Sequence, residues 1–157
     1  MVNLRPVAFV TAVFTVVCFV SSGLTVFAQP DVSASCAALM VAETGELIYG
    51  KNEHDRRSMA STTKIMTSLL VIEALTPQRK ITVSADMLNV EGTSMGLLPG
   101  DTVTLEGLVY GMLLQSGNDA ANVTAITLGG NVENFVSMMN KRAGEIGMND
   151  THFETPS

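Results

Sequence analysis

Ser61 and Lys64 stand three residues apart at the start of the segment ASTTKIMTSLLVIEAL, residues 60–75. A serine becomes a useful nucleophile when a base removes its proton, and a lysine can be that base when burial lowers its pKa. On a helix, residues three apart share one face, so the pair fits a nucleophile with its base. The same spacing fits a helix-capping serine beside a surface lysine, and the pair alone does not separate the two interpretations.

A second polar group, Ser116-Gly117-Asn118, interrupts two apolar patterns further along the chain. A loop between helices can present a hydroxyl and a carboxamide to a cleft. The hydroxyl of Ser116 could relay a proton between Lys64 and a leaving amine, and the amide of Asn118 could hold a peptide carbonyl. In isolation, a plain turn that uses the backbone freedom of glycine is the simpler interpretation.

The elements that must position these residues are helices. Apolar residues recur from Thr62 until Pro77 stops the pattern, which predicts a helix with Ser61 in its first turn. A second helix is expected after an N-cap at Thr104, a third is expected to be capped by Asp119 and to stop at Gly129-Gly130, and a fourth to run from about Asn131 to Gly147. The first helix is expected to bury Ile65, Met66, Leu69, Leu70 and Ile72. The second is expected to bury Leu105, Leu108, Val109, Met112 and Leu113. The fourth is expected to bury Val132, Phe135, Met138, Met139, Ala143 and Ile146.

Strands are expected mainly before Ser61. Residues 36–50 place two short apolar runs around Glu43-Thr44-Gly45-Glu46, a pattern typical of a β-hairpin in which Gly45 takes a positive φ. The polar residues 51–60 then connect the hairpin to the Ser61 segment. A further short strand is expected at Lys80–Ser84.

The first thirty residues predict export. Arg5 precedes an apolar run at residues 7–20, and Val26-Phe27-Ala28 follows, which is the pattern of a signal peptide covering residues 1–28. The alternative is an uncleaved membrane anchor, but Ser21, Ser22 and Gly23 interrupt the run. The mature chain, 29–157, is therefore expected outside the cytoplasm, with Cys36 as its one cysteine, a small buried hydrophobe in a strand.

Composition excludes several functions. The 157 residues, 46% apolar and 15% charged, suit one globular domain or part of one. A net charge of -6 with nine scattered Lys and Arg argues against nucleic acid as a partner. His54 and His152 have no Cys or carboxylate cluster at ligand spacing, so neither a metal nor another cofactor is expected.

Four segments together resemble a known family: SCAALMVAETGELIYGKN, MASTTKIMTSLLVIEAL, PGDTVTLEGLVYGMLLQSGNDAAN and ENFVSMMNKRAGEIGMNDTHFETPS. In this order and spacing they resemble the serine D-alanyl-D-alanine carboxypeptidases, the low-molecular-mass penicillin-binding proteins, over residues 36–157. The resemblance implies that Ser61 is the acylated nucleophile, Lys64 its base, Ser116 the proton relay and Asn118 a substrate-binding amide. It also implies a peptidoglycan stem peptide ending in D-Ala-D-Ala as substrate and β-lactams as inhibitors.

The implied fold is α+β, of the β-lactamase and DD-peptidase type, with an antiparallel sheet flanked by helices and a helical subdomain. Members of the family carry a third motif, Lys-Thr-Gly, and no such tripeptide follows Ser116 here. Residues 29–157 are therefore expected to be the N-terminal part of a DD-peptidase domain that lacks the later strands and any C-terminal membrane-anchoring segment. Expressed alone, they are expected to be poorly folded and inactive, because a lone hairpin is marginally stable and uncovered helices expose apolar faces.

The sequence also fits two alternative functions. A serine β-lactamase uses the same nucleophile and lysine but needs a carboxylate to activate water, and Glu154 is the candidate for that carboxylate. A non-catalytic module that binds the cell wall would fit the absence of the third motif.

Overall fold

The computed structural model describes residue 30 and residues 32–157. The expected signal peptide, residues 1–28, lies outside the described residues. The chain divides into two compact units, Met1–Arg56 and Arg57–Ser157, and each is described by itself.

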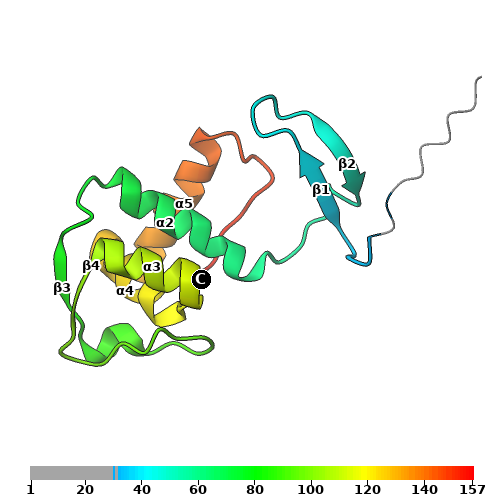
Figure 1. Ribbon diagram of the computed structural model, residues 1–157. Coiled ribbons are helices and arrows are strands. Elements are labelled where there is room, and N and C mark those ends of the chain that lie inside the picture. The colour runs from blue at the N-terminus through cyan, green and yellow to red at the C-terminus, as the bar shows by residue number, and fades with distance from the viewer. Residues whose placement is uncertain (1–29, 31) are drawn as a thin grey trace, which may run out of the picture. The chain divides into compact units, whose positions relative to one another are not determined.

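The first unit contains the predicted β-hairpin (Figure 1). Strand β1 (Ala37–Met40) pairs antiparallel with β2 (Leu47–Lys51), and Gly45 in the connecting turn has a φ of 72°. Both predictions are confirmed. The prediction for Cys36 was wrong, because pairing begins at Ala37, and Cys36 is a half-buried bend residue with a free thiol.

The second unit is built from four α-helices that pack on one another (Figure 1). They are α2 (Thr63–Glu73), α3 (Leu105–Gln115), α4 (Asn118–Gly129) and α5 (Val132–Glu145). Two short 3-10 helices, η1 (Ala60–Thr62) and η2 (Ala85–Leu88), accompany them. The expected strand at Lys80–Ser84 is present as β3 (Lys80–Thr82), which pairs antiparallel with β4 (Thr102–Thr104), a strand that the sequence pattern did not predict.

Two helices begin where the sequence predicted, and each is capped by a side chain. The hydroxyl of Thr104 accepts a hydrogen bond from Gly107 N, and the carbonyl oxygen of the Asn131 side chain accepts one from Asn134 N. The prediction that Asp119 caps α4 was wrong: Gly117 is the N-cap residue, and Asp119 is the second residue of the helix. Its carboxylate is occupied instead by a loop that precedes α3, as described below.

The helices enclose two apolar clusters. The first joins α2, β3, α3 and α4, and the second joins α2, α4, α5 and the C-terminal segment. Their buried members are Val71, Ile81, Val83, Leu105, Leu108, Met112, Ala120, Ala121 and Val123 in the first cluster, and Met66, Leu70, Ala125, Phe135, Met139, Ala143 and Phe153 in the second.

The buried face of α2 differs from the predicted stripe. Ile65 and Ile72 are each 62% exposed, whereas Lys64, Thr67 and Ser68 are buried. Apolar periodicity could not indicate this rotation, because two of the three buried polar side chains are kept inside by hydrogen bonds, Lys64 to Ser61 and Thr67 to the carbonyl of Pro156. On α3, Leu105, Leu108 and Met112 are buried as expected, whereas Leu113 is exposed. Met138 and the C-cap residue Ile146 of α5 are also exposed, although both were expected on the buried face.

Candidate active site

Ser61 lies in η1, immediately before the first turn of α2, and not in the first turn itself. The residue before it, Ala60, has a φ of 46°, in the left-handed region that non-glycine residues rarely adopt. Such backbone strain is concentrated at functional sites, where the surrounding structure maintains it. Ser61 itself is exposed, whereas Lys64 on the first turn of the helix that follows is buried.

Lys64 is the buried partner of Ser61. It is 1% exposed, and its Nζ lies 3.2 Å from Ser61 Oγ. Burial lowers the pKa of Lys64 below the usual 10.5, because the charged ammonium is poorly solvated there. A lowered pKa increases the fraction of neutral amine, which is the form that can accept the proton of a serine hydroxyl.

Ser116 comes to the same place from a distant part of the chain. It is the C-cap residue of α3 and has a φ of 56°. Its Oγ donates to Ser61 Oγ at 2.7 Å, across 55 residues of sequence. Four non-glycine residues in the described chain have a positive φ, and two of them lie at Ser61. Ala60 precedes Ser61 in the chain, and Ser116 forms a hydrogen bond with it.

Asn118 lies at the start of α4 and faces a different neighbour. Its Nδ2 donates to the carbonyl of Glu91 at 2.7 Å, and its backbone N–H donates to the carbonyl of Thr93 at 2.7 Å. A carboxamide nitrogen has two hydrogens, so one remains for another acceptor. The structure thus brings Lys64 and Ser116 into contact with Ser61, and Asn118 follows Ser116 by two residues in the sequence.

The segment 91–97 supports this group and was missed by the sequence reading. Besides its two bonds to Asn118, it contributes Thr93 Oγ1, which donates to the carbonyl of Ser116 at 2.6 Å. The sequence EGTSMG signals only a polar turn. Nothing in its local pattern indicates that it contacts residues more than twenty positions away.

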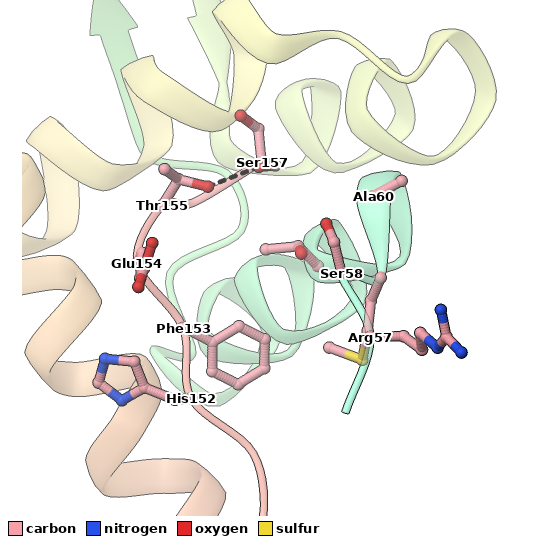
Figure 2. Close-up of a pocket in the computed structure, with 10 residues that line it drawn as sticks. Arg57, Ser58, Ala60, His152, Phe153, Glu154, Thr155 and Ser157 are labelled. Carbon is pink, nitrogen blue, oxygen red and sulfur yellow. Dashed lines mark hydrogen bonds between the residues drawn. The ribbon is translucent and has the colours of Figure 1, made fainter. Parts of the chain in front are cut away.

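A cavity of about 290 Å³ lies beside η1, between it and the C-terminal segment (Figure 2). Met59 and Ala60 line it, together with His152, Glu154 and other residues of the C-terminal segment, but Ser61, Lys64 and Ser116 do not. Glu154 is exposed, and its carboxylate makes no hydrogen bond to Ser61 or Lys64. Within residues 32–157, no cluster of His, Cys, Asp and Glu suited to a metal ion is found.

Comparison with known proteins gives one consistent result. The sequence pattern of a family described as D-alanyl-D-alanine carboxypeptidase, Peptidase S11, matches residues 24–157. The D-alanyl-D-alanine carboxypeptidase DacF of Bacillus subtilis (strain 168) is 37% identical over 129 residues, which cover 79% of this chain and 33% of that protein. The chain spans about a third of the length of such curated relatives.

Solved structures agree with the sequence match. The D-alanyl-D-alanine carboxypeptidase DacD from Francisella tularensis superimposes with a TM-score of 0.77 at 36% identity, over 83% of this chain and 33% of that one. Penicillin binding protein 6B from Escherichia coli gives a TM-score of 0.72 at 34% identity, over 83% of this chain and 45% of that one. The expected α+β fold of the DD-peptidase type is therefore confirmed.

Proposed function

Because the chain belongs to the D-alanyl-D-alanine carboxypeptidase family, we propose that the protein is a serine-type D-Ala-D-Ala carboxypeptidase that acts through an acyl-enzyme on Ser61. The observation that carries the proposal is the convergence of two groups on one oxygen. Ser61 Oγ has the buried Lys64 Nζ at 3.2 Å and Ser116 Oγ at 2.7 Å.

In the proposed acylation step, Ser61 Oγ attacks the carbonyl carbon of the bond between the two D-alanines. The neutral amine of Lys64 takes the hydroxyl proton as the oxygen–carbon bond forms. When the carbon–nitrogen bond breaks, Ser116 passes a proton to the departing amine and recovers one from Lys64. D-alanine leaves, and the rest of the peptide remains as an ester on Ser61.

In the second step, water attacks the ester carbonyl. Lys64 and Ser116, which both bond to Ser61 Oγ, are proposed to take the proton of the water and return one to that oxygen. Asn118 has a role in binding rather than in proton transfer, because its side chain contacts the carbonyl of Glu91 and not Ser61. Its remaining N–H is proposed to hold a carbonyl of the substrate peptide.

The proposed substrate is a peptidoglycan stem peptide ending in D-Ala-D-Ala, and the proposed inhibitors are β-lactams. A β-lactam presents a reactive amide to the same oxygen, but its amine stays tethered after ring opening. It therefore leaves a bulky ester on Ser61.

Peptidoglycan lies outside the cytoplasmic membrane, which agrees with the proposed export and cleavage after Ala28. Within residues 32–157, no helix has the length and apolarity needed to cross a bilayer. Association with the membrane is part of the same proposal. N-terminal sequencing of the exported protein tests the cleavage, with Gln29 as the expected first residue.

The function is tested by measuring D-alanine release from a stem-peptide analogue with the full-length protein. We expect release from an analogue ending in D-Ala-D-Ala, none from its L-Ala-L-Ala counterpart, and loss of activity in Ser61→Ala. Ser58→Ala is the matched control, since Ser58 is an exposed serine of the same segment, whereas the Lys64 amine bonds to Ser61. Rapid turnover of penicillin without D-alanine release would instead indicate a β-lactamase, and neither activity would indicate a binding module.

A further inference from the structure

Asp119 is a buried carboxylate that has several hydrogen-bond donors and no cationic partner among the described residues. Asp119 is 4% exposed, and its carboxylate accepts five hydrogen bonds. The donors are Ser94 Oγ at 2.6 Å, Met95 N at 2.9 Å, Gly96 N at 3.1 Å, Leu97 N at 3.0 Å and Ala120 N at 2.9 Å. Four of the five come from one loop.

These bonds keep the carboxylate charged. Burial alone raises the pKa of Asp119, but the hydrogen bonds from Ser94, Met95, Leu97 and Ala120 outweigh it and leave the pKa below its usual value. A buried charge that is satisfied by backbone N–H groups orders the backbone that supplies them. Asp119 therefore fixes the conformation of residues 94–97.

The fixed loop in turn holds the segment that carries Ser116. Thr93, next to the anchored residues, donates from its hydroxyl to the carbonyl of Ser116 at 2.6 Å and accepts from Asn118 N at 2.7 Å. The loop passes so close to Gly117 that a Cβ there would lie 3.0 Å from Met95 N and 2.7 Å from Asp119 Oδ1. The left-handed conformation of Ser116 is thus supported on one side by this loop.

We propose that Asp119 is a positioning residue for Ser116: by anchoring residues 94–97, it holds the hydroxyl of Ser116 against Ser61. This inference rests on the proposed function, because it concerns the step in which Ser116 transfers a proton. It assigns Asp119 no contact with substrate. A displacement of about 1 Å at a reacting group can cost on the order of 100-fold in rate, so the anchor has a measurable effect.

The informative substitution is Asp119→Asn, which keeps the shape of the side chain. Whichever way the carboxamide is turned, its NH₂ group faces N–H or O–H donors where a carboxylate oxygen accepted them. The loop is therefore released although no volume is removed. Asp101→Asn is the matched control, since Asp101 also accepts a backbone N–H, that of Leu98 at 2.8 Å, but has no bond to residues 116–119.

The test is a double-mutant cycle in the full-length protein, with acylation of Ser61 by a fluorescent penicillin as the readout. We expect Ser116→Ala to slow acylation by about 100-fold and Asp119→Asn by about 10- to 100-fold. The double variant should be acylated at the same rate as Ser116→Ala alone, to within about twofold, because Asp119 then has no Ser116 hydroxyl to position. Asp101→Asn should acylate at the wild-type rate.

Multiplying effects in the double variant would overturn the inference, since Asp119 would then act independently of Ser116. If Asp119→Asn does not fold, Thr93→Val replaces it in the cycle. This variant removes only the hydroxyl that donates to Ser116, and it should show the same dependence on Ser116 with a smaller effect. A wild-type protein that is not acylated on Ser61 would remove the proposed function, whereas an acylated one with multiplying effects removes this inference alone.

Discussion

Ser116 Oγ donates a 2.7 Å hydrogen bond to Ser61 Oγ, although α3 must end in a left-handed residue to place it there. A non-glycine residue in this conformation costs about 1 kcal/mol relative to glycine. The structure therefore maintains strain at the point where the two hydroxyls meet. Glycine at position 116 would relieve the strain and remove the hydroxyl at once.

This predicts a separation of stability from activity at position 116. Ser116→Gly should raise the free energy of unfolding by about 1 kcal/mol relative to Ser116→Ala, because only glycine adopts the backbone angle freely. Both variants should lose acylation equally, since both lack the hydroxyl. Thermal unfolding and penicillin labelling measure the two effects. Equal free energies of unfolding for the two variants would show that the backbone at position 116 is not strained.

Lys64 is expected to oppose stability while it supports the chemistry. Burial lowers the pKa of Lys64 in the folded state below 10.5. At a pH between the folded pKa and 10.5, the unfolded chain therefore binds a proton that the folded chain does not. Stability due to this group is therefore lowest below its folded pKa and rises with pH toward 10.5. Replacing the amine with an apolar side chain of similar length removes the penalty.

Lys64→Met should accordingly stabilise the protein by about 1 to 2 kcal/mol at neutral pH. Its advantage over the wild type should shrink as the pH is raised, which thermal unfolding across a pH series would show. Acylation should fall by about 1,000-fold or more, because the base is gone. An advantage that grows with pH would have the wrong sign for a lysine with a lowered pKa.

Two residues of α5 test the position of the second apolar cluster. Phe135 is fully buried, whereas Met138, which the sequence pattern placed on the same buried face, is 39% exposed. Phe135→Ala should cost about 3 to 5 kcal/mol of unfolding free energy and Met138→Ala less than about 1 kcal/mol. Denaturant unfolding of the full-length protein measures both, and similar losses would show that α5 does not bury Phe135 and expose Met138.

Two adjacent buried hydroxyls of α2 allow a direct comparison of a bonded and an unbonded side chain. Thr67 Oγ1 donates to the carbonyl of Pro156 at 2.6 Å, while the buried Ser68 Oγ has no partner among the described residues. Thr67→Val should cost about 1 to 3 kcal/mol, because it leaves a buried carbonyl unsatisfied. Ser68→Ala should be neutral or stabilising, since it removes a group that is already unsatisfied. The reverse order in unfolding experiments would mean that Thr67 does not hold the C-terminal segment.

The parts of the fold that the sequence predicted are those set by local chemistry. Thr104 and Asn131 start helices through their own side chains, Gly45 turns the hairpin, and the spacing of Ser61 and Lys64 places them on one face. Each of these depends on residues only a few positions apart. The resemblance to a family supplied the link between Ser61 and Ser116.

The parts that the sequence did not predict depend on distant partners. Asp119 was expected to cap its own helix but instead accepts bonds from Ser94 to Leu97, more than twenty residues earlier. The rotation of α2 has the same origin, because hydrogen bonds, and not apolar periodicity, hold Lys64 and Thr67 inside. A pattern read along the chain contains no information on such bonds.

The central claim, that Ser61 is the acylated residue, is tested most directly by locating a penicillin adduct. Trypsin cleaves after Arg57 and Lys64, so residues 58–64 form one peptide that contains Ser58 and Ser61. After incubation of the full-length protein with penicillin, mass spectrometric fragmentation of this peptide should place the adduct on Ser61, and Ser61→Ala should carry none. An adduct on Ser58, on Ser116, or one that persists in Ser61→Ala would contradict the account.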